Sequence, residues 1–304
     1  MMKLQNKLAN LQEYIRNGEM NRIKYSMKKH LYSLLYQSTN GINVVKEDWD
    51  ILLVLDACRY DYFKNVYGKF LKGDLEKIDS KGSKTSEWLE KNFTGKYDDI
   101  IYISANPQTH VVGIENKFFE TERLYNKKWD EEYKTVLPED VVNKTLEIKK
   151  EYPDKRIISH FLQPHAPYIG DKKIRNDQGE IIEAKDMWDE IRFRNEKVSK
   201  KKLTKCYQKN LEMVLKSITK LGKINEKVVI TSDHGELFGE YGLWEHPKNV
   251  HVPELIEVPW FEVEDINKDI SDHNFDIGDK TGQNVESESE EEIKKKLEAL
   301  GYKT

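Results

Sequence analysis

The sequence of 304 residues lacks the features of several classes of protein. Two cysteines, Cys58 and Cys206, are too few for a disulfide framework, and neither belongs to a Cys-x-x-Cys pair. The longest apolar run is Ile51–Leu55, whereas a membrane-spanning helix needs roughly 20 apolar residues. Residues 1–30 contain no apolar segment of the kind that secretory signals have. These absences predict a cytoplasmic protein whose only membrane association is peripheral.

An excess of charge of one sign is also missing. Lysine and arginine (50) nearly balance aspartate and glutamate (54), so the chain does not have the basic character of a nucleic-acid-binding protein. Hydrophobic residues (38%) and aromatic residues (11%) are abundant enough for a packed core, which excludes a disordered chain. At about 150 residues per domain, the length allows one large or two ordinary domains.

The charge that is present gathers at the two ends of the chain. Residues 1–30 have a net charge of +5, and residues 264–304 have a net charge of −6. We therefore expect three parts: a basic helical extension over 1–46, a central domain over 47–263, and an acidic tail over 264–304. Within the tail, Asp265–Asn284 is expected to be loop and Glu286–Leu300 a short helix, because its acids precede its lysines.

Helical spacing of apolar residues in the N-terminal extension predicts a basic amphipathic helix. The apolar positions are Ile23, Met27, Leu31, Leu34 and Leu35, with Lys24, Lys28 and Lys29 between them. Two interpretations fit this pattern. The helix packs on the domain, or it lies on an anionic membrane surface.

The central part alternates short apolar runs with helical patterns, which predicts an α/β fold with a mostly parallel central sheet and helices on both faces. The expected strands are Ile51–Leu55, Ile100–Ser104, Arg156–Leu162 and Val228–Thr231. The expected helices are Thr85–Phe93, Pro138–Glu151 and a long one over 203–221 that ends at Gly222. Residues 105–135 and 165–200 read as insertions over the sheet edge.

Polar residues follow four of these strands. Asp56 follows the first, Asn106 the second, His165 the third, and Asp233 and His234 the fourth. Ligands of open α/β sheets bind beyond the carboxyl ends of the strands. A single Asp there is usually a helix cap, but carboxylates and imidazoles converging from several strands are a ligand set for Zn²⁺ or Mn²⁺.

Three segments resemble the alkaline phosphatase superfamily, and within it the sulfatase-like branch with the phosphoethanolamine and phosphoglycerol transferases. They are Asp56, the run Thr-Ser-Asp-His-Gly-Glu at 231–236, and the run Gly-Leu-Trp-Glu-His-Pro at 242–247. The resemblance spans residues 48–262. It implies an alkaline-phosphatase-like fold and a central domain that is catalytic.

The resemblance also implies a nucleophile in the stretch 82–89, Gly-Ser-Lys-Thr-Ser-Glu-Trp-Leu, which falls on Thr85 with Ser83 as the fallback. A hydroxyl at a helix N-terminus lies beside free N–H groups that hold phosphate or sulfate. The simpler interpretation is that both residues are helix caps.

The resemblance implies a first metal bound by Asp56, Thr85, Asp233 and His234, and a second metal or substrate site with His165 and His246. One or two ions of Zn²⁺ or Mn²⁺ are therefore expected. The substrate-binding candidates are less specific. Arg59 could face the ester or pair with Asp61, Asn106 could touch substrate or form a turn, Ser83 could touch substrate, and His160 could join His165 or be a structural histidine.

Other features depart from the family pattern. Neither cysteine has the Cys-x-Pro-x-Arg context of a formylglycine sulfatase, and Ala57 replaces the second acid often found after the first strand. A site for calcium alone is therefore not expected, because calcium prefers more oxygen ligands. The membrane spans of the transferases are also missing.

The predicted function is a metal-dependent hydrolase or transferase of phosphate or sulfate esters, with a small-molecule or glycan substrate and a possible place in surface-glycan or polysaccharide metabolism. Thr85 attacks, and His246 or His165 holds a second metal or protonates the leaving group. Two alternatives stay open: a non-catalytic, metal-stabilised binding module of the same fold, and a phosphosugar mutase-like enzyme.

Overall fold

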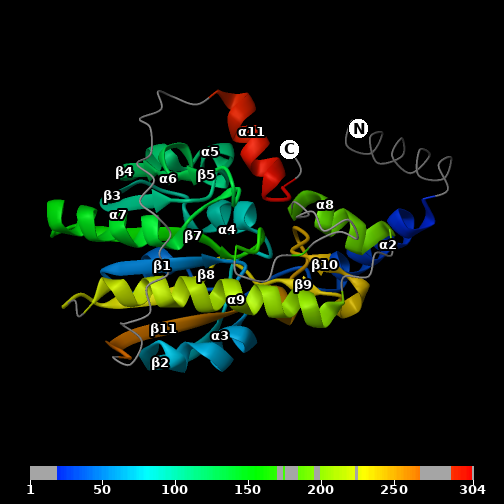
Figure 1. Ribbon diagram of the computed structural model, residues 1–304, viewed down its shortest axis with the longest axis horizontal. Helices are drawn as coiled ribbons and strands as arrows, with labels where there is room; N and C mark the ends of the chain where they lie inside the picture. Colours follow the sequence, from blue (N-terminus) through cyan, green and yellow to red (C-terminus); the bar gives the residue numbers. More distant parts are fainter. Residues whose placement is uncertain are drawn as a thin grey trace.

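A computed structural model describes residues 19–169, 174, 184–194, 199–222, 225–267 and 289–302. Its centre is a sheet with the strand order β2-β11-β8-β1-β7-β3-β4 (Figure 1). The strands are β1 (Ile51–Asp56), β2 (Leu71–Asp79), β3 (Tyr97–Ser104), β4 (Phe118–Arg123), β7 (Arg156–Pro164), β8 (Val228–Ser232) and β11 (Glu257–Ile266). Only β11 runs against its neighbours, so the predicted mostly parallel sheet is confirmed.

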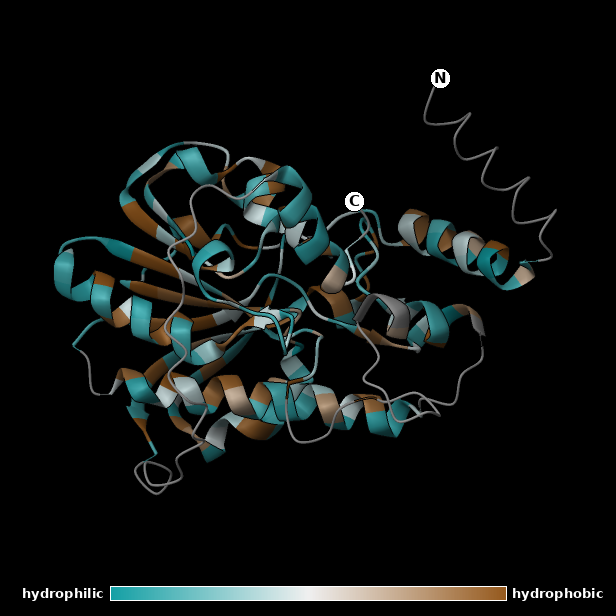
Figure 2. Ribbon diagram, turned by 45° about the horizontal axis from the view of Figure 1, so that its top comes forward, coloured by the Kyte–Doolittle hydropathy of each residue, from teal (hydrophilic) through white to brown (hydrophobic). Residues whose placement is uncertain are grey.

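The middle strand β1 is apolar throughout because both faces of the sheet are covered. Successive side chains of a strand point to opposite faces, so β1 contributes to two cores. Leu53 and Leu55 pack with the helices of one face, and Leu52 and Val54 pack with Trp88 on the other. Figure 2 shows these hydrophobic strands enclosed by helices whose outer surfaces are hydrophilic.

Helices cover the two faces unequally. The first face is covered by α3 (Tyr60–Val66), α6 (Leu124–Lys127), α7 (Pro138–Glu151), α9 (Lys200–Ile218) and α11 (Glu290–Ala299), and the second by α4 (Thr85–Asn92). The predicted helices over 85–93, 138–151 and 203–221 are α4, α7 and α9, the last extended by a short 3-10 turn that ends at Gly222. Smaller elements are α5 (Gln108–Val112), α8 (Ala184–Asp189) and α10 (Pro253–Ile256), with the hairpins β5 (Trp129–Asp130) with β6 (Thr135–Val136) and β9 (Leu237–Phe238) with β10 (Trp244–Glu245).

Residues 105–135 are not the strand-free insertion that the sequence suggested. They include β4, which pairs with β3 and forms the edge of the sheet. Phe118 and Phe119 begin the strand, but Glu120, Thr121, Glu122 and Arg123 follow, so no continuous apolar run marks it. In the second expected insertion, 165–200, residues 170–173, 175–183 and 195–198 lie outside the described residues, and the described ones include α8 but no strand.

Parts of the region expected to be an acidic tail, 264–304, belong to the sheet and to the hydrophobic core. Strand β11 continues to Ile266, past the boundary expected at 263/264, because it pairs along its length with β2. The loop expected over 265–284 lies largely outside the described residues. The expected terminal helix is present as α11, which buries Ile293, Leu297 and Leu300 in the core beneath α6.

The N-terminal helix α2 (Met20–Leu35) forms as predicted but turns its apolar stripe outward. Its inner face carries tyrosines: the Tyr25 hydroxyl donates to the Trp244 carbonyl, and Tyr32 packs against Tyr241. Met27 and Leu31 are 67% and 52% exposed. The helix therefore packs on the domain, as one of the two interpretations had it, but through tyrosines rather than through the apolar stripe. Among the described residues, no helix has both the length and the apolar character to cross a bilayer.

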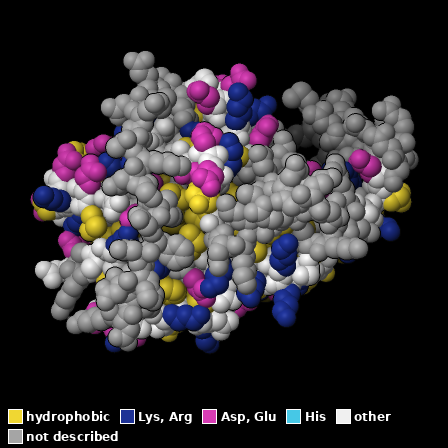
Figure 3. Space-filling model, in the orientation of Figure 1, with side chains coloured by type: hydrophobic (Ala, Val, Ile, Leu, Met, Phe, Trp, Pro, Cys, Tyr) yellow, Lys and Arg dark blue, Asp and Glu magenta, His cyan; other side chains and the backbone are white. Residues whose placement is uncertain are grey.

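The charged residues of the surface are mixed in sign. Figure 3 shows lysine and arginine side chains interspersed with aspartate and glutamate on the face it presents. Such a surface agrees with the near-balance of charges in the sequence.

Candidate active site

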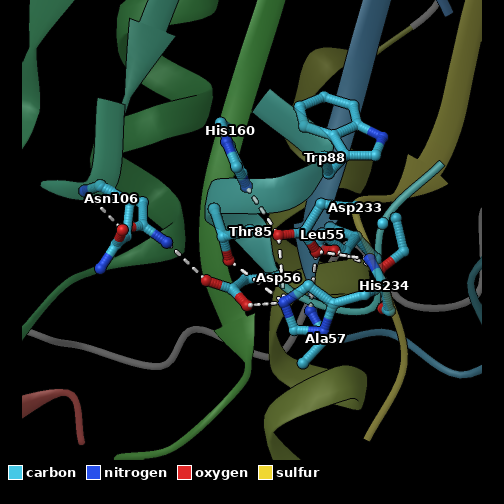
Figure 4. A network of polar contacts seen from close by, with 12 residues as sticks. Leu55, Asp56, Ala57, Thr85, Trp88, Asn106, His160, Asp233 and His234 are labelled. Atoms are coloured by element: carbon cyan, nitrogen blue, oxygen red, sulfur yellow. Dashed lines mark hydrogen bonds and ion pairs between the residues drawn. The ribbon is translucent and has the colours of Figure 1, made fainter. Parts of the chain in front are cut away.

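The sheet brings Asp56, Asp233 and His234 together, as the strand-end argument predicted. Asp56 is the last residue of β1, and Asp233 and His234 follow β8, which pairs with β1 in parallel up to Leu55 and Ser232. All three site residues are fully buried. Figure 4 shows the two carboxylates on either side of the His234 ring.

The turn after β1 holds this geometry. Ala57 has a φ of +59°, in the left-handed region that a non-glycine residue rarely adopts, and its N–H donates to Asp233 Oδ1 over 3.1 Å. The Tyr207 hydroxyl donates to the Ala57 carbonyl and accepts from the Arg59 N–H. After β8, Gly235 lies against the Glu254 carbonyl, which leaves no room for a Cβ atom.

One oxygen of each carboxylate has no hydrogen-bond partner. These are Asp56 Oδ1 and Asp233 Oδ2, which lie 3.6 and 3.3 Å from His234 Nε2. Buried charged oxygens without partners are costly in the absence of a cation. The ligand atoms of the three residues lie within 4.8 Å of one another, so the donor set fits a divalent metal such as Zn²⁺ or Mn²⁺.

Burial and mutual repulsion divide the pKa values of the two carboxyls. Burial and the neighbouring Asp233 raise the pKa of Asp56 well above its ordinary value. Burial also acts to raise that of Asp233, but His234 and His160 hold the pKa of Asp233 below its ordinary value. The pair therefore favours a proton or another cation between its members.

Thr85 lies at this cluster as the first residue of α4. Its side chain is fully buried, and its Oγ1 is 3.1 Å from His234 Nε2. His234 Nδ1 lies 2.8 Å from the Gly235 carbonyl, which assigns the proton of a neutral ring to Nδ1 and leaves Nε2 as an acceptor for the Thr85 hydroxyl. The Thr85 side chain makes no capping hydrogen bond to its own helix, since the N-cap position belongs to Lys84.

Ser83 has a structural environment instead. Its hydroxyl can donate its one proton to Glu87 Oε2 or to the Pro247 carbonyl, both within 3.1 Å, and it accepts from the Val250 N–H. Glu87 is buried as well and accepts from His251 Nε2 over 2.8 Å. These bonds tie the start of α4 to residues 247–251, and they direct Ser83 away from Thr85's partners.

A second cluster lies beside the first. It comprises His165, Glu236 and His246, whose ligand atoms are again within 4.8 Å of one another. The ring centroids of His234 and His246 are 4.5 Å apart, which joins the two clusters. Sequence reasoning chose His165 and His246 but passed over Glu236, although it closes the run at 231–236.

The second cluster is neutral in the absence of a cation. Burial lowers the pKa of His165 to about 4 and lowers that of His246 well below its ordinary value, with His234 adding to both effects. Burial, with Glu245 and Asp56, raises the pKa of Glu236 well above its ordinary value. Glu236 Oε2 has no hydrogen-bond partner. Two imidazole lone pairs and a carboxyl make a second donor set that fits Zn²⁺.

His160 and Asn106 contact the carboxylates of the first cluster. His160 Nδ1 is 2.7 Å from the Tyr102 hydroxyl, and its Nε2 is 3.7 Å from Asp233 Oδ2. Asn106 Nδ2 donates to Asp56 Oδ2 over 2.7 Å. The strand β7 can present both His160 and His165 to the site because its pairing with β1 shifts register between them.

Arg59 does not face the hydroxyl of Thr85. Its guanidinium makes two hydrogen bonds to Asp61 and one to Glu240, so the alternative of pairing with Asp61 is the one observed. Lys84, which the sequence reasoning passed over, is the cation beside the nucleophile. Burial lowers its pKa, and its charge acts on Asp56, His165 and His246.

Tyr302 is the least expected member of the site. Its hydroxyl donates to Asp56 Oδ2 over 3.0 Å, accepts from Asn106 Nδ2 over 3.1 Å, and lies 3.3 Å from Thr85 Oγ1. Its ring lies parallel to the His165 ring at 5.7 Å. No local pattern marks this residue, which stands near the end of the acidic tail.

Comparisons with known proteins bear on the fold. No family model and no curated protein matches the sequence. Among solved structures, the soluble domain of lipooligosaccharide phosphoethanolamine transferase A from Neisseria meningitidis is 16% identical, with 72% of this chain and 76% of that chain covered and a TM-score of 0.47. The integral membrane form of that enzyme is 16% identical, with 73% of this chain and 49% of that one covered and a TM-score of 0.49.

A third structure is the C-terminal periplasmic domain of a phosphoethanolamine transferase from Escherichia coli in complex with zinc. It is 11% identical, covers 75% of this chain and 76% of its own, and has a TM-score of 0.46. The similar structures belong to the enzyme group that the motifs resembled, within the alkaline phosphatase superfamily. At this identity the likeness concerns the fold, and a periplasmic neighbour gives no support to the expected cytoplasmic location.

Proposed function

We propose that this protein transfers or hydrolyses phosphate esters with Thr85 as the nucleophile. One observation carries the proposal: the Thr85 hydroxyl is fully buried at the start of a helix, 3.1 Å from an imidazole acceptor and beside two carboxylates with unpartnered oxygens. A helix cap does not need these neighbours, whereas a nucleophile does.

Asp56, Asp233, His234 and Thr85 would hold the first divalent metal. When bound, it would lower the pKa of the Thr85 hydroxyl and offset the charge of the ester oxygens. His165, Glu236 and His246 would hold a second ion.

The other residues position the reacting groups. Thr85 Oγ1 gives up its proton to water and forms a bond to phosphorus as the bond from phosphorus to the leaving oxygen breaks, and the leaving oxygen takes up a proton from water. The free N–H groups of the first turn of α4 and the Lys84 ammonium face the charge that develops on the phosphoryl oxygens. An acceptor alcohol or water then displaces Thr85 and restores the free hydroxyl.

The low pKa values of His165 and His246 refine their proposed roles. Both rings favour the neutral form at neutral pH, in which each offers one lone pair and its remaining N–H is a very weak acid. We therefore assign them to metal binding rather than to general acid catalysis.

The test is a panel of aryl phosphate monoester, aryl phosphate diester and aryl sulfate substrates, each assayed with Zn²⁺ or Mn²⁺. A phosphorylated peptide containing Thr85, trapped by acid quenching and identified by mass spectrometry, is the expected intermediate. Metal binding without turnover on any of these substrates would favour the binding module instead.

We also propose that α2 docks this site on an anionic membrane surface. Its outer face combines the exposed Met27, Leu31 and Leu35 with the exposed Lys24 and Lys28. Apolar side chains flanked by lysines suit the boundary between acyl chains and anionic headgroups. The helix lies beside the 241–251 segment that bears His246, so docking would bring ester headgroups near the site.

Co-sedimentation with vesicles tests this contact. The wild-type chain is expected to bind vesicles that contain phosphatidylserine and not vesicles of phosphatidylcholine alone. Leu31→Glu should abolish binding, whereas Leu146→Glu, at an exposed leucine of α7, should have no effect. Equal binding by wild type and Leu31→Glu would contradict the proposal.

A further inference from the structure

The nucleophile of the site is closed off by the end of the chain itself. Asp56, Thr85 and Asn106 are fully buried, and Tyr302 is only 2% exposed. A phosphorus atom has to come within roughly 3–3.5 Å of the attacking oxygen before reaction. The Tyr302 hydroxyl already stands 3.3 Å from Thr85 Oγ1, on the side of Asp56 and Asn106.

The remaining directions around Thr85 Oγ1 are occupied by the site's own groups. His234 Nε2 lies 3.1 Å away, and Asp233 Oδ2 lies 3.3 Å from that same nitrogen. These residues are required for the proposed chemistry. Tyr302 is the neighbour that can leave without removing a metal ligand.

The other contacts of Tyr302 are those expected of a bound ligand. Its ring stacks on His165 and lies 6.0 Å from the centroid of His246, and Lys84 Nζ is 5.1 Å from its ring centroid. The hydroxyl satisfies Asn106 and one oxygen of Asp56, as a phosphoryl oxygen would. While Tyr302 is present, the Lys84 ammonium faces an aromatic ring rather than an anion.

The way α11 ends allows this side chain to move while the helix stays in place. Gly301 has a φ of +86°, and the Tyr302 N–H bonds back to the Leu297 carbonyl, so the chain reverses direction at the glycine. The helix is anchored separately, by Leu297 in the core and by Lys296, whose Nζ donates to the Tyr125 carbonyl. Rotation about Gly301 would release Tyr302 by breaking its N–H bond to Leu297 and its packing in the core, while Leu297 and Lys296 keep the helix in place.

We propose that Tyr302 is an intramolecular plug that competes with phosphate-bearing ligands for the catalytic site. The inference rests on the proposed function only in requiring that the site bind a phosphoryl group. The apparent affinity for such a ligand is the intrinsic affinity multiplied by the fraction of molecules in which the plug is out. Removing the plug therefore strengthens phosphate binding without adding a contact.

The experiment measures binding of inorganic phosphate to the zinc-loaded full chain by calorimetry. Tyr302→Ala is expected to bind at least tenfold more tightly than wild type, and Tyr302→Phe, which keeps the ring and loses the hydroxyl, to lie between them. Lys295→Ala is the matched control, because Lys295 is 71% exposed on the same helix. Equal or weaker phosphate binding by Tyr302→Ala, or no binding by any variant, would overturn the plug.

A second measurement follows Tyr302 in the wild-type chain. Nitration of Tyr302 by tetranitromethane, read from the mass of the C-terminal peptide, should be slow in the zinc-loaded protein and rise when phosphate is added. Unchanged or slower nitration would contradict displacement. Neither readout depends on turnover, so failure of the plug and failure of the proposed esterase or transferase activity are distinguished.

Discussion

The two ligand clusters share one pocket but differ in composition. The first combines two carboxylates, one imidazole and the hydroxyl of Thr85, whereas the second combines two imidazoles and the carboxyl of Glu236. Only the first contains a hydroxyl placed against an acceptor. Under the proposed function, bond formation to the substrate would belong to the first cluster, and the second would hold a cation beside it.

Thr85→Ala should have the largest effect, since it removes the only attacking atom proposed for either cluster. Activity on an aryl phosphate is expected to fall by at least about 10³-fold while the thermal unfolding profile stays two-state. Thr85→Ser keeps the hydroxyl and serves as the control, with a much smaller loss. A wild-type rate for Thr85→Ala would contradict this comparison, because the first cluster would then not supply the attacking hydroxyl.

Glu236→Gln should have an intermediate effect. It keeps the shape of the second cluster but weakens one of its three donors, and losses of about 10–100-fold in metal affinity or activity are typical of such changes near a metal. Metal content by mass spectrometry should fall while the phosphorylated Thr85 peptide still forms. Loss of that peptide would show that bond formation to Thr85 also needs the second cluster, contrary to the proposal.

Asp56→Asn should stabilise the metal-free protein by about 1–2 kcal/mol, because it removes the repulsion between two buried carboxylates. The same variant should lose most of the rise in Tm that zinc produces in wild type, since a ligand is lost. The measurement is thermal unfolding with and without zinc at neutral pH. A lower Tm for the metal-free variant would mean that the carboxylate stabilises the fold on its own.

Glu87→Gln should have the smallest effect, because Glu87 is not a member of the first cluster. It supports that cluster through its hydrogen bonds at the start of α4. Burial acts to raise the pKa of Glu87, but hydrogen bonds from His251, Lys91 and the Ser83 N–H lower it below its ordinary value. A carboxyl whose pKa is lower in the folded chain than in the unfolded chain stabilises the fold at pH values above its unfolded-state pKa, near 4.5. That stabilisation is lost as the pH falls through the folded-state pKa.

Denaturant titrations from pH 7 to pH 3 follow this loss. The wild-type chain should lose about 1 kcal/mol more of its unfolding free energy below pH 4.5 than Glu87→Gln does. Glu254→Gln is a suitable control, as its carboxylate bonds only at the surface to Tyr241 among the contacts observed. Parallel curves for wild type and Glu87→Gln would contradict a depressed pKa.

Most of the first cluster could be predicted because its members stand at strand ends. A parallel sheet forces the residues after β1 and β8 to one edge, so Asp56, Asp233 and His234 were found from the apolar runs before them. The same reasoning could not decide whether Arg59 faces the ester or pairs with acidic residues. It pairs with both Asp61, two residues away, and Glu240, which is distant in sequence and meets it only in the fold.

The N-terminal helix is a second feature that hydrophobic periodicity predicted only in part. Periodicity predicted α2 correctly and even its apolar stripe, but not which face would meet the domain. Tyrosine hydroxyls and rings supplied the inner contacts, because the surface beneath them offers the Trp244 carbonyl and the Tyr241 ring. Leucines were left at the surface as a result.

The sequence by itself determined the parallel sheet, the main helices and the residue types at the strand ends, since these follow from local periodicity and from the direction of parallel strands. The tertiary structure alone decided that Glu236 completes the second cluster, that Lys84 is the nearby cation, and that Tyr302 stands over Thr85. Such contacts join residues as far apart as Asp56 and Tyr302, and no spacing along the chain encodes a distance between them.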